Sequence, residues 1–211
     1  MGQTDNQPPS SPSGFKPQRL VVGITGASGA ILGIRLLETL KPTPIETHLI
    51  LSDNARLTIA QETDYSVDSV RSLASVSYNF HDIGASIASG SFAALGMVII
   101  PCSIKTLSAI SNSYTDDLVV RAADVCLKEG RPLILVVRET PLHAGHLRLM
   151  QEASSAGAVI FPPVPSFYIR PQSVDEIINN TVGRVLKRLG IENDLYQEWQ
   201  GLSSGLTDEP A

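Results

Sequence analysis

The stretch Leu20-Val21-Val22-Gly23-Ile24-Thr25-Gly26-Ala27-Ser28-Gly29-Ala30 predicts the class of fold. Its first half is a short, continuous apolar run, which is typical of a strand buried on both faces of a sheet. Its second half consists of small residues and predicts a tight turn. Apolar residues then recur with helical spacing from Ile31 to Leu40. A buried strand that turns directly into an amphipathic helix is the unit of an α/β protein.

The same strand-and-helix unit recurs along the chain. Strands are expected at 46–51, 95–100, 132–137 and 158–161, and helices at 103–112, 115–128, 142–156 and 173–189. Because strands alternate with helices, we expect a doubly wound parallel sheet of at least five strands, covered by helices on both faces. The segment 76–91 fits neither the strand pattern nor the helix pattern.

The composition of the 211 residues fits one folded domain. Hydrophobic residues make up 43% and charged residues 18%, so the chain can form an apolar core, and wholesale disorder is excluded. The formal net charge is −5, whereas binding to DNA or RNA normally requires a basic face. We therefore expect no nucleic-acid partner, while a small phosphorylated ligand stays open.

The ends of the chain suggest domain limits and a location. Residues 1–18 predict a flexible extension, residues 19–201 a single domain, and residues 202–211 a loose polar tail. The extension lacks the apolar stretch of a secretory signal, and no window reaches the roughly 18 apolar residues of a membrane-spanning helix. The two cysteines, Cys102 and Cys126, show no spacing typical of a metal site or disulfide. We expect a cytoplasmic protein with no membrane partner and no metal.

Small and polar residues follow each predicted strand. In a parallel sheet the carboxyl ends of the strands meet at one edge, where ligands bind. Gly26-Ala27-Ser28-Gly29 follows the first strand, Ser52-Asp53-Asn54 the second, Ser103-Ile104-Lys105-Thr106 the third, and Arg138-Glu139 the fourth. Hydroxyls, backbone amides and two cations together suit a phosphate group, and a glutamate beside them can transfer a proton.

Each of these motifs also has a purely structural interpretation. Gly23, Gly26 and Gly29 form GxxGxxG rather than the dinucleotide pattern GxGxxG, so the first turn can be a tight turn without a ligand. The serines can be ordinary helix caps, and Arg138 and Glu139 can form an ion pair. The residues alone indicate an α/β protein for a phosphorylated ligand, and they leave an enzyme and a flavin- or nucleotide-binding module both open.

Five motifs in a fixed order resemble one known family. They are Gly23–Ala30 (GITGASGA), Pro101–Leu107 (PCSIKTL), Arg121–Val125 (RAADV), Val137–Leu142 (VRETPL) and Pro162–Tyr168 (PPVPSFY). Together they resemble the UbiX/Pad family of flavin prenyltransferases, over about residues 19–200. The resemblance implies a three-layer, flavodoxin-like or Rossmann-like fold and a homododecamer whose active sites lie where subunits meet.

The resemblance also implies a reaction. Such enzymes join the dimethylallyl group of dimethylallyl phosphate to N5 and C6 of reduced FMN and release phosphate, without a metal. The prenylated FMN then serves a UbiD-type decarboxylase, in ubiquinone biosynthesis or aromatic-acid decarboxylation. A flavin-dependent cysteine decarboxylase and a non-enzymatic flavin-binding regulatory subunit are the alternatives.

The motifs carry over three sets of site residues. The FMN contacts implied are Gly26, Ala27, Ser28, Ser52, Ser103, Ile104, Lys105, Thr106 and Arg138. The dimethylallyl phosphate contacts implied are Tyr168, Arg184, Arg121 and Lys128. The catalytic residues implied are Glu139, Ser28, Glu62 and Trp199. Either Glu139 or the departing phosphate would take up the proton that leaves flavin C6. Glu62 and Trp199 would reach the site across subunit boundaries.

Overall fold

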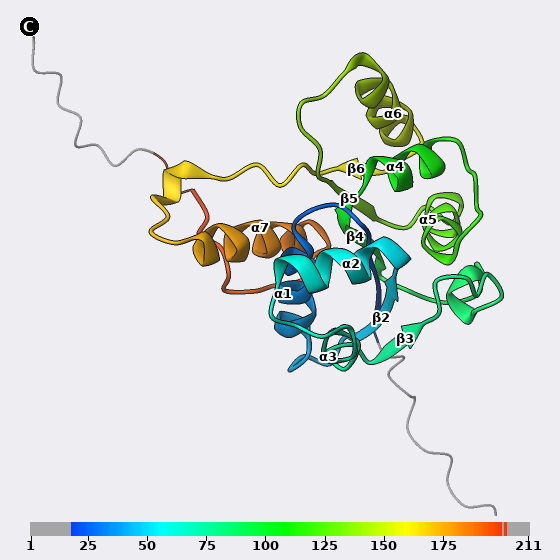
Figure 1. Cartoon of the computed structure of the whole chain (residues 1–211), viewed down its shortest axis with the longest axis horizontal. Helices are drawn as coiled ribbons and strands as arrows, with labels where there is room; N and C mark the ends of the chain where they lie inside the picture. The colour runs from blue at the N-terminus through cyan, green and yellow to red at the C-terminus, as the bar shows by residue number, and fades with distance from the viewer. Residues whose placement is uncertain (1–17, 200, 202–211) are drawn as a thin grey trace, which may run out of the picture.

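The computed structural model describes residues 18–199 and 201, and its centre is one parallel sheet (Figure 1). The strand order is β3-β2-β1-β4-β5-β6, and every neighbouring pair is parallel. The strands are β1 (Arg19–Ile24), β2 (Glu46–Leu51), β3 (Val76–Tyr78), β4 (Gly96–Cys102), β5 (Leu133–Val137) and β6 (Val159–Ile160). The expected doubly wound parallel sheet is confirmed.

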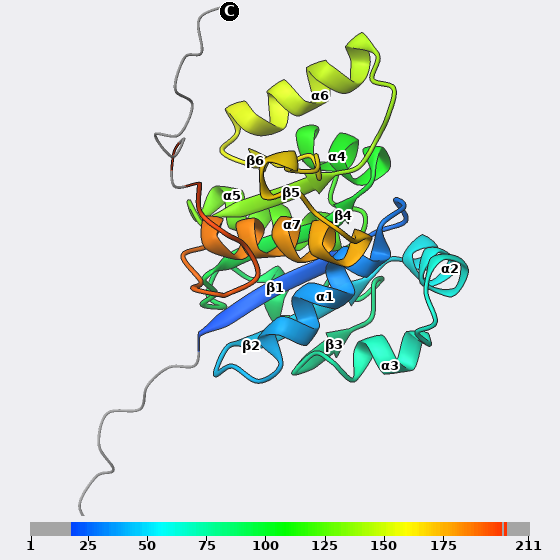
Figure 2. The same ribbon diagram turned by 90° about the vertical axis from the view of Figure 1, so that its left-hand side faces the viewer.

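Helices cover both faces of this sheet. They are α1 (Ala30–Leu40), α2 (Asp53–Glu62), α3 (Val67–Arg71), α4 (Ile104–Ser111), α5 (Leu118–Lys128), α6 (Ala144–Ser155) and α7 (Val174–Arg188). Buried residues of α1, α2, α3 and α7 form one core cluster with the sheet, and those of α4, α5 and α6 form the other. Figure 2 shows α1 and α7 crossing in front of the strands. The molecule therefore has the three layers of a flavodoxin-like or Rossmann-like fold.

The direction of winding reverses between β1 and β4. The chain runs outward from β1 through β2 to β3, and then outward from β4 through β5 to β6 on the other side. The Thr25 hydroxyl joins the two inner strands, because it donates to the Pro101 carbonyl at 2.8 Å and accepts from the Ser103 amide at 2.8 Å. Helices leave this point on opposite faces, which creates the crevice where ligands bind in such sheets.

All five strands expected from the sequence are present, and the structure adds β3. This strand lies at the edge of the sheet and pairs only with β2. Val76 and Ser77 are exposed, so β3 lacks the apolar run by which a buried strand is recognised. The predicted extension up to residue 17 and the predicted tail from 202 onward lie outside the described residues. None of the described helices is long and apolar enough to cross a membrane.

Candidate functional site

A cleft of about 370 Å³ lies at the carboxyl ends of the strands, beside the reversal point. Seven of the residues that line it were expected at the site: Gly26, Ser52, Ser103, Ile104, Lys105, Thr106 and Glu139. Four further lining residues were not among the predicted ligand contacts: Asp53, Asn54, Phe80 and Asp117. Because the carboxyl ends of the parallel strands meet at one edge, segments that are far apart in the sequence come together in this cleft.

Two serines of the cleft also cap helices. The Ser52 hydroxyl accepts from the Ala55 amide at 3.2 Å, and the Ser103 hydroxyl accepts from the Thr106 amide at 3.3 Å. The structural interpretation of both serines is thus correct. It does not compete with ligand binding, because a hydroxyl that accepts one bond can still donate its own proton to a ligand.

Gly26 allows the turn after β1 to approach α2 closely. A Cβ atom on Gly26 would lie 2.3 Å from Asn54 Cβ, far inside van der Waals contact. Asn54 belongs to the first turn of α2, so a side chain at position 26 would push this helix away. The glycine therefore fixes the width of the cleft between two of its walls.

The amides at the start of α1 hold an anion, and this anion belongs to the chain itself. The Glu62 carboxylate accepts from the Gly29 amide at 2.8 Å and from the Ala30 amide at 3.4 Å. We expected a glycine turn and helix N-terminus suited to a ligand's negative charge. In the structure it is the Glu62 carboxylate, at the end of α2, that accepts from these two amides.

The other helix N-termini around the cleft differ in charge. Asp53 lies in the first turn of α2, and the Asp117 carboxylate caps α5 by accepting from the Val120 amide at 2.9 Å. The first turn of α4 contains Lys105 and no acidic residue. Burial raises the pKa of Asp117, although the Val120 amide and Lys105 oppose the rise. The end of α4 is therefore the most favourable position in the cleft for a phosphate.

Tyr168 and Trp199 lie on a C-terminal arm, defined here as residues 162–170 and 195–199, and Arg184 contacts this arm from α7. The rings of Tyr168 and Trp199 meet edge to face at 5.5 Å, and the Tyr168 hydroxyl donates to the Gln197 carbonyl at 3.4 Å. The Arg184 guanidinium donates to the Ser166 hydroxyl at 3.3 Å. This group holds three of the expected residues, none of which lines the cleft of its own chain.

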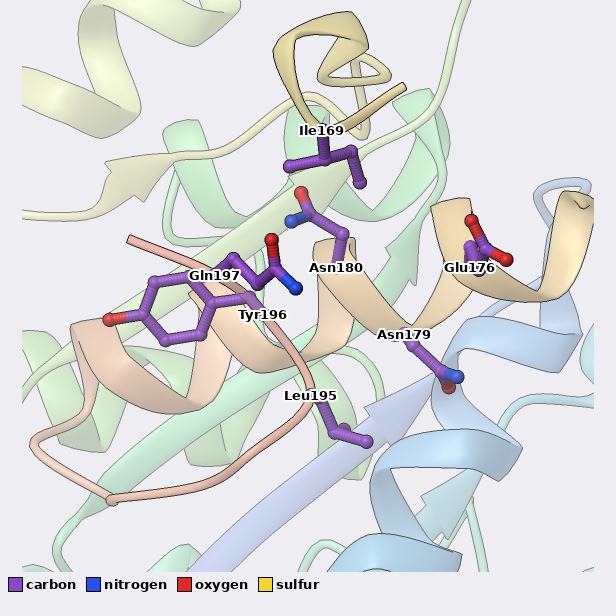
Figure 3. A pocket seen from close by; sticks show the side chains of 7 residues that line it. All are labelled: Ile169, Glu176, Asn179, Asn180, Leu195, Tyr196 and Gln197. Atoms are coloured by element: carbon purple, nitrogen blue, oxygen red, sulfur yellow. The ribbon is translucent and has the colours of Figure 1, made fainter. Parts of the chain in front are cut away.

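A small pocket lies beside the contacts that join the two parts of this arm. It measures about 180 Å³, and Figure 3 shows Ile169 on one side and the segment 195–197 on the other, with α7 between them. Tyr168 and Trp199 come directly before and shortly after these walls in the sequence. Both aromatic side chains remain about half exposed, at 46% and 56%.

The remaining expected residues lie apart from both groups. Arg121 and Lys128 are seven positions apart, on one side of α5, and form ion pairs with Asp124 at 3.2 Å and Glu129 at 2.5 Å. Three more follow the strand ends without lining the cleft: Ala27 is buried, while Ser28 and Arg138 are exposed.

Two other side chains with reactive groups, Cys102 and His143, do not contribute reactive groups to the cleft. Burial raises the pKa of the Cys102 thiol strongly, which leaves it protonated and unreactive although it lies near Lys105 in sequence. His143 caps α6 by accepting from the Gly145 amide at 3.0 Å, so it serves the helix. Among residues 18–199 and 201, no three His, Cys, Asp or Glu side chains gather as a metal site.

The winding of the sheet reverses between β1 and β4, and beside this point lies a cleft that contains hydroxyls, amides and one lysine. These two features define an α/β protein of the nucleotide- or flavin-binding class. The family model described as "Flavoprotein" matches residues 9–185. The chain is 62% identical to flavin prenyltransferase UbiX of Escherichia coli K12 over 187 residues, which are 87% of this chain and 99% of that protein. The chain belongs to the flavoprotein family and, within it, to the UbiX flavin prenyltransferases.

Solved structures agree with this assignment. AnUbiX (PadA1), in complex with FMN and dimethylallyl pyrophosphate, superposes with a TM-score of 0.87 and 49% identity, over 89% of this chain and all of that one. A dodecameric FMN-dependent UbiX-like decarboxylase from Escherichia coli O157:H7 superposes with a TM-score of 0.85 and 50% identity, over 87% of this chain and all of that one. The FMN-dependent cysteine decarboxylase TvaF shares only the fold, at 18% identity and a TM-score of 0.55 over 68% of this chain and 89% of that one.

Proposed function

We propose that this protein is a flavin prenyltransferase. It joins the dimethylallyl group of dimethylallyl phosphate to N5 and C6 of reduced FMN, releases phosphate, and supplies prenylated FMN to a UbiD-type decarboxylase. The observation that carries the proposal is the cleft, where seven residues assigned by resemblance to FMN binding or proton transfer meet at the reversal point of the sheet. We further propose that the protein works in the cytoplasm.

The residues present in the cleft fit FMN. The N-terminus of α4 with Lys105 would hold the phosphate, since the neighbouring helix ends carry Glu62, Asp53 and Asp117. The hydroxyls of Ser52 and Ser103 would donate to polar groups of the flavin. The reduced isoalloxazine ring supplies the nucleophilic positions of the reaction.

Glu139 would move the proton. It follows β5, lines the cleft and is oriented by the Thr140 amide, which donates to its Oε1 at 3.0 Å. A carboxylate held in this way can accept the proton that leaves flavin C6 when the carbon–carbon bond forms. Ser28, exposed at the end of the turn after β1, would contribute a hydrogen bond.

The basic side chains would neutralise the departing phosphate. Its negative charge grows as the allylic carbon–oxygen bond breaks, and Arg121, Lys128 and Arg184 can stabilise that charge without a metal ion. The aromatic faces of Tyr168 and Trp199 would stabilise the allylic cation. These five residues lie outside the cleft of their own chain, so we propose that neighbouring subunits of a homo-oligomer, a dodecamer as in the E. coli relative, bring them to it.

One experiment tests the proposed function. The protein is incubated without oxygen with reduced FMN and dimethylallyl phosphate, and the extracted flavin is weighed by mass spectrometry. The mass of the flavin is expected to increase by one five-carbon prenyl unit. This increase should be absent in the Arg184→Ala variant, which should still bind FMN. Unmodified flavin from the parent protein contradicts the proposal. Oxidative decarboxylation of a peptide with a C-terminal cysteine would favour the cysteine decarboxylase instead.

A further inference from the structure

The segment 79–81 borders the cleft at Phe80 and is anchored to α5. Phe80 is only 8% exposed, lines the cleft, and its carbonyl accepts from the Leu118 amide of α5 at 3.0 Å. His81 packs its ring edgewise on Phe80 at 5.0 Å. Its own amide donates to the Asn79 side chain at 3.1 Å. The backbone that carries the imidazole is therefore held in place by the body of the fold.

His81 contacts the first residue of α2, which itself lines the cleft. Its Nε2 lies 2.9 Å from Oδ2 of Asp53, the first residue of that helix. Because an ionised carboxylate can only accept, Nε2 is the nitrogen that carries the proton in this bond. The bond uses one carboxylate oxygen, and a carboxylate has further acceptor positions for a ligand on the cleft side.

We propose that His81 is a positioning residue for the flavin, which holds Asp53 so that its carboxylate accepts from the ribityl hydroxyls of FMN. The inference rests on the proposed function, because it takes FMN as the occupant of the cleft. His81 has a second effect in the same contact. Its N–H draws on the negative charge of Asp53, which otherwise repels the FMN phosphate within the same cleft.

A merely structural role would have different consequences. The side chains of His81 and Asp53 are 65% and 55% exposed, and exposed pairs of this kind contribute little to stability. Loss of the pair should therefore leave folding almost unchanged. Loss of the pair changes the charge and the direction of the Asp53 carboxylate, which borders the flavin. The change in binding affinity should therefore depend on which part of the flavin is present.

The test compares three flavins on two variants. FMN, riboflavin, which lacks the phosphate, and lumiflavin, which lacks the ribityl chain, are titrated by fluorescence quenching. With His81→Leu we expect FMN to bind about fivefold more weakly, the scale of one partly exposed charge-assisted hydrogen bond. The affinity for riboflavin should fall less than the affinity for FMN, and the affinity for lumiflavin should not change. His81→Gln keeps an N–H donor and should bind FMN within about twofold of the parent.

A rescue variant and a control complete the experiment. Adding Asp53→Asn to His81→Leu removes the uncompensated charge and should restore most of the FMN affinity. Arg148→Leu breaks an exposed ion pair of 2.6 Å on α6, away from the cleft, and should leave all three affinities unchanged. Equal weakening of all three flavins, or no rescue by Asp53→Asn, would overturn the proposal. Tight FMN binding without prenylation would refute the proposed function while leaving the His81 result readable, and a parent that binds no FMN would refute both.

Discussion

Replacing Gly26 with alanine is expected to force apart two walls of the cleft. The new methyl group would lie 2.3 Å from Asn54 Cβ and 3.2 Å from the Asn54 carbonyl carbon. Carbon atoms pack at about 3.5–4.0 Å, so the turn after β1 and the start of α2 must separate by about 1 Å. Overpacking of this kind costs about 1–3 kcal/mol. In a chain of this size each kcal/mol lowers Tm by about 2–4 °C.

The same displacement should weaken function more than stability. Both walls line the cleft, and a misplacement of about 1 Å can slow a reaction by about 10²-fold. Urea unfolding measures the stability, flavin fluorescence measures FMN binding, and single-turnover mass spectrometry measures prenylation. Gly84→Ala is the matched control, because a methyl group there meets only Asp82 Oδ1 at 3.5 Å. Parental FMN affinity and stability in Gly26→Ala, or an equal loss in the control, would refute the reasoning.

Three further predictions concern single side chains. Glu139→Gln should keep FMN affinity within about twofold but slow prenylation by about 10²–10⁴-fold, as single-turnover analysis would show. Burial lowers the pKa of His48 from 6.5, against a smaller opposing effect of Glu46. The unfolded chain therefore takes up the proton first, and the free energy of unfolding in urea should fall as pH drops below about 6.5, less so in His48→Gln. Burial raises the pKa of Cys126 to about 11 and that of Cys102 further, so iodoacetamide at pH 7.5 should label neither thiol before denaturant is added.

The buried part of the fold could be predicted because burial leaves a pattern in the sequence. The runs that become β1, β4 and β5 are largely apolar on both faces, as an inner parallel strand requires. Helix ends were less accurate. The helix expected at 115–128 begins at Leu118, because Asp117 is its cap, and a cap residue cannot be distinguished from an early helical residue by apolar spacing.

The site could be predicted where it follows the strand ends and not where it depends on tertiary contacts. Ser52 and Ser103 directly follow buried strands, so their place in one cleft follows from topology. Phe80 reaches the cleft from a segment without any periodicity. The bond between Glu62 and the Gly29 amide joins residues 33 positions apart, and no local pattern encodes it.

The exposed apolar side chains of the C-terminal arm connect assembly with chemistry. Phe167 is 72% exposed and Trp199 56%, on the same arm as Tyr168. Trp199 contacts the Tyr168 ring, and exposed apolar surface of this kind is typical of a protein–protein contact. In the proposed oligomer that contact buries the arm against another subunit, which removes apolar surface from water and brings aromatic rings to the cleft. An aromatic neighbour stabilises an allylic cation and the exclusion of water protects it from capture, so the same contact would provide both effects.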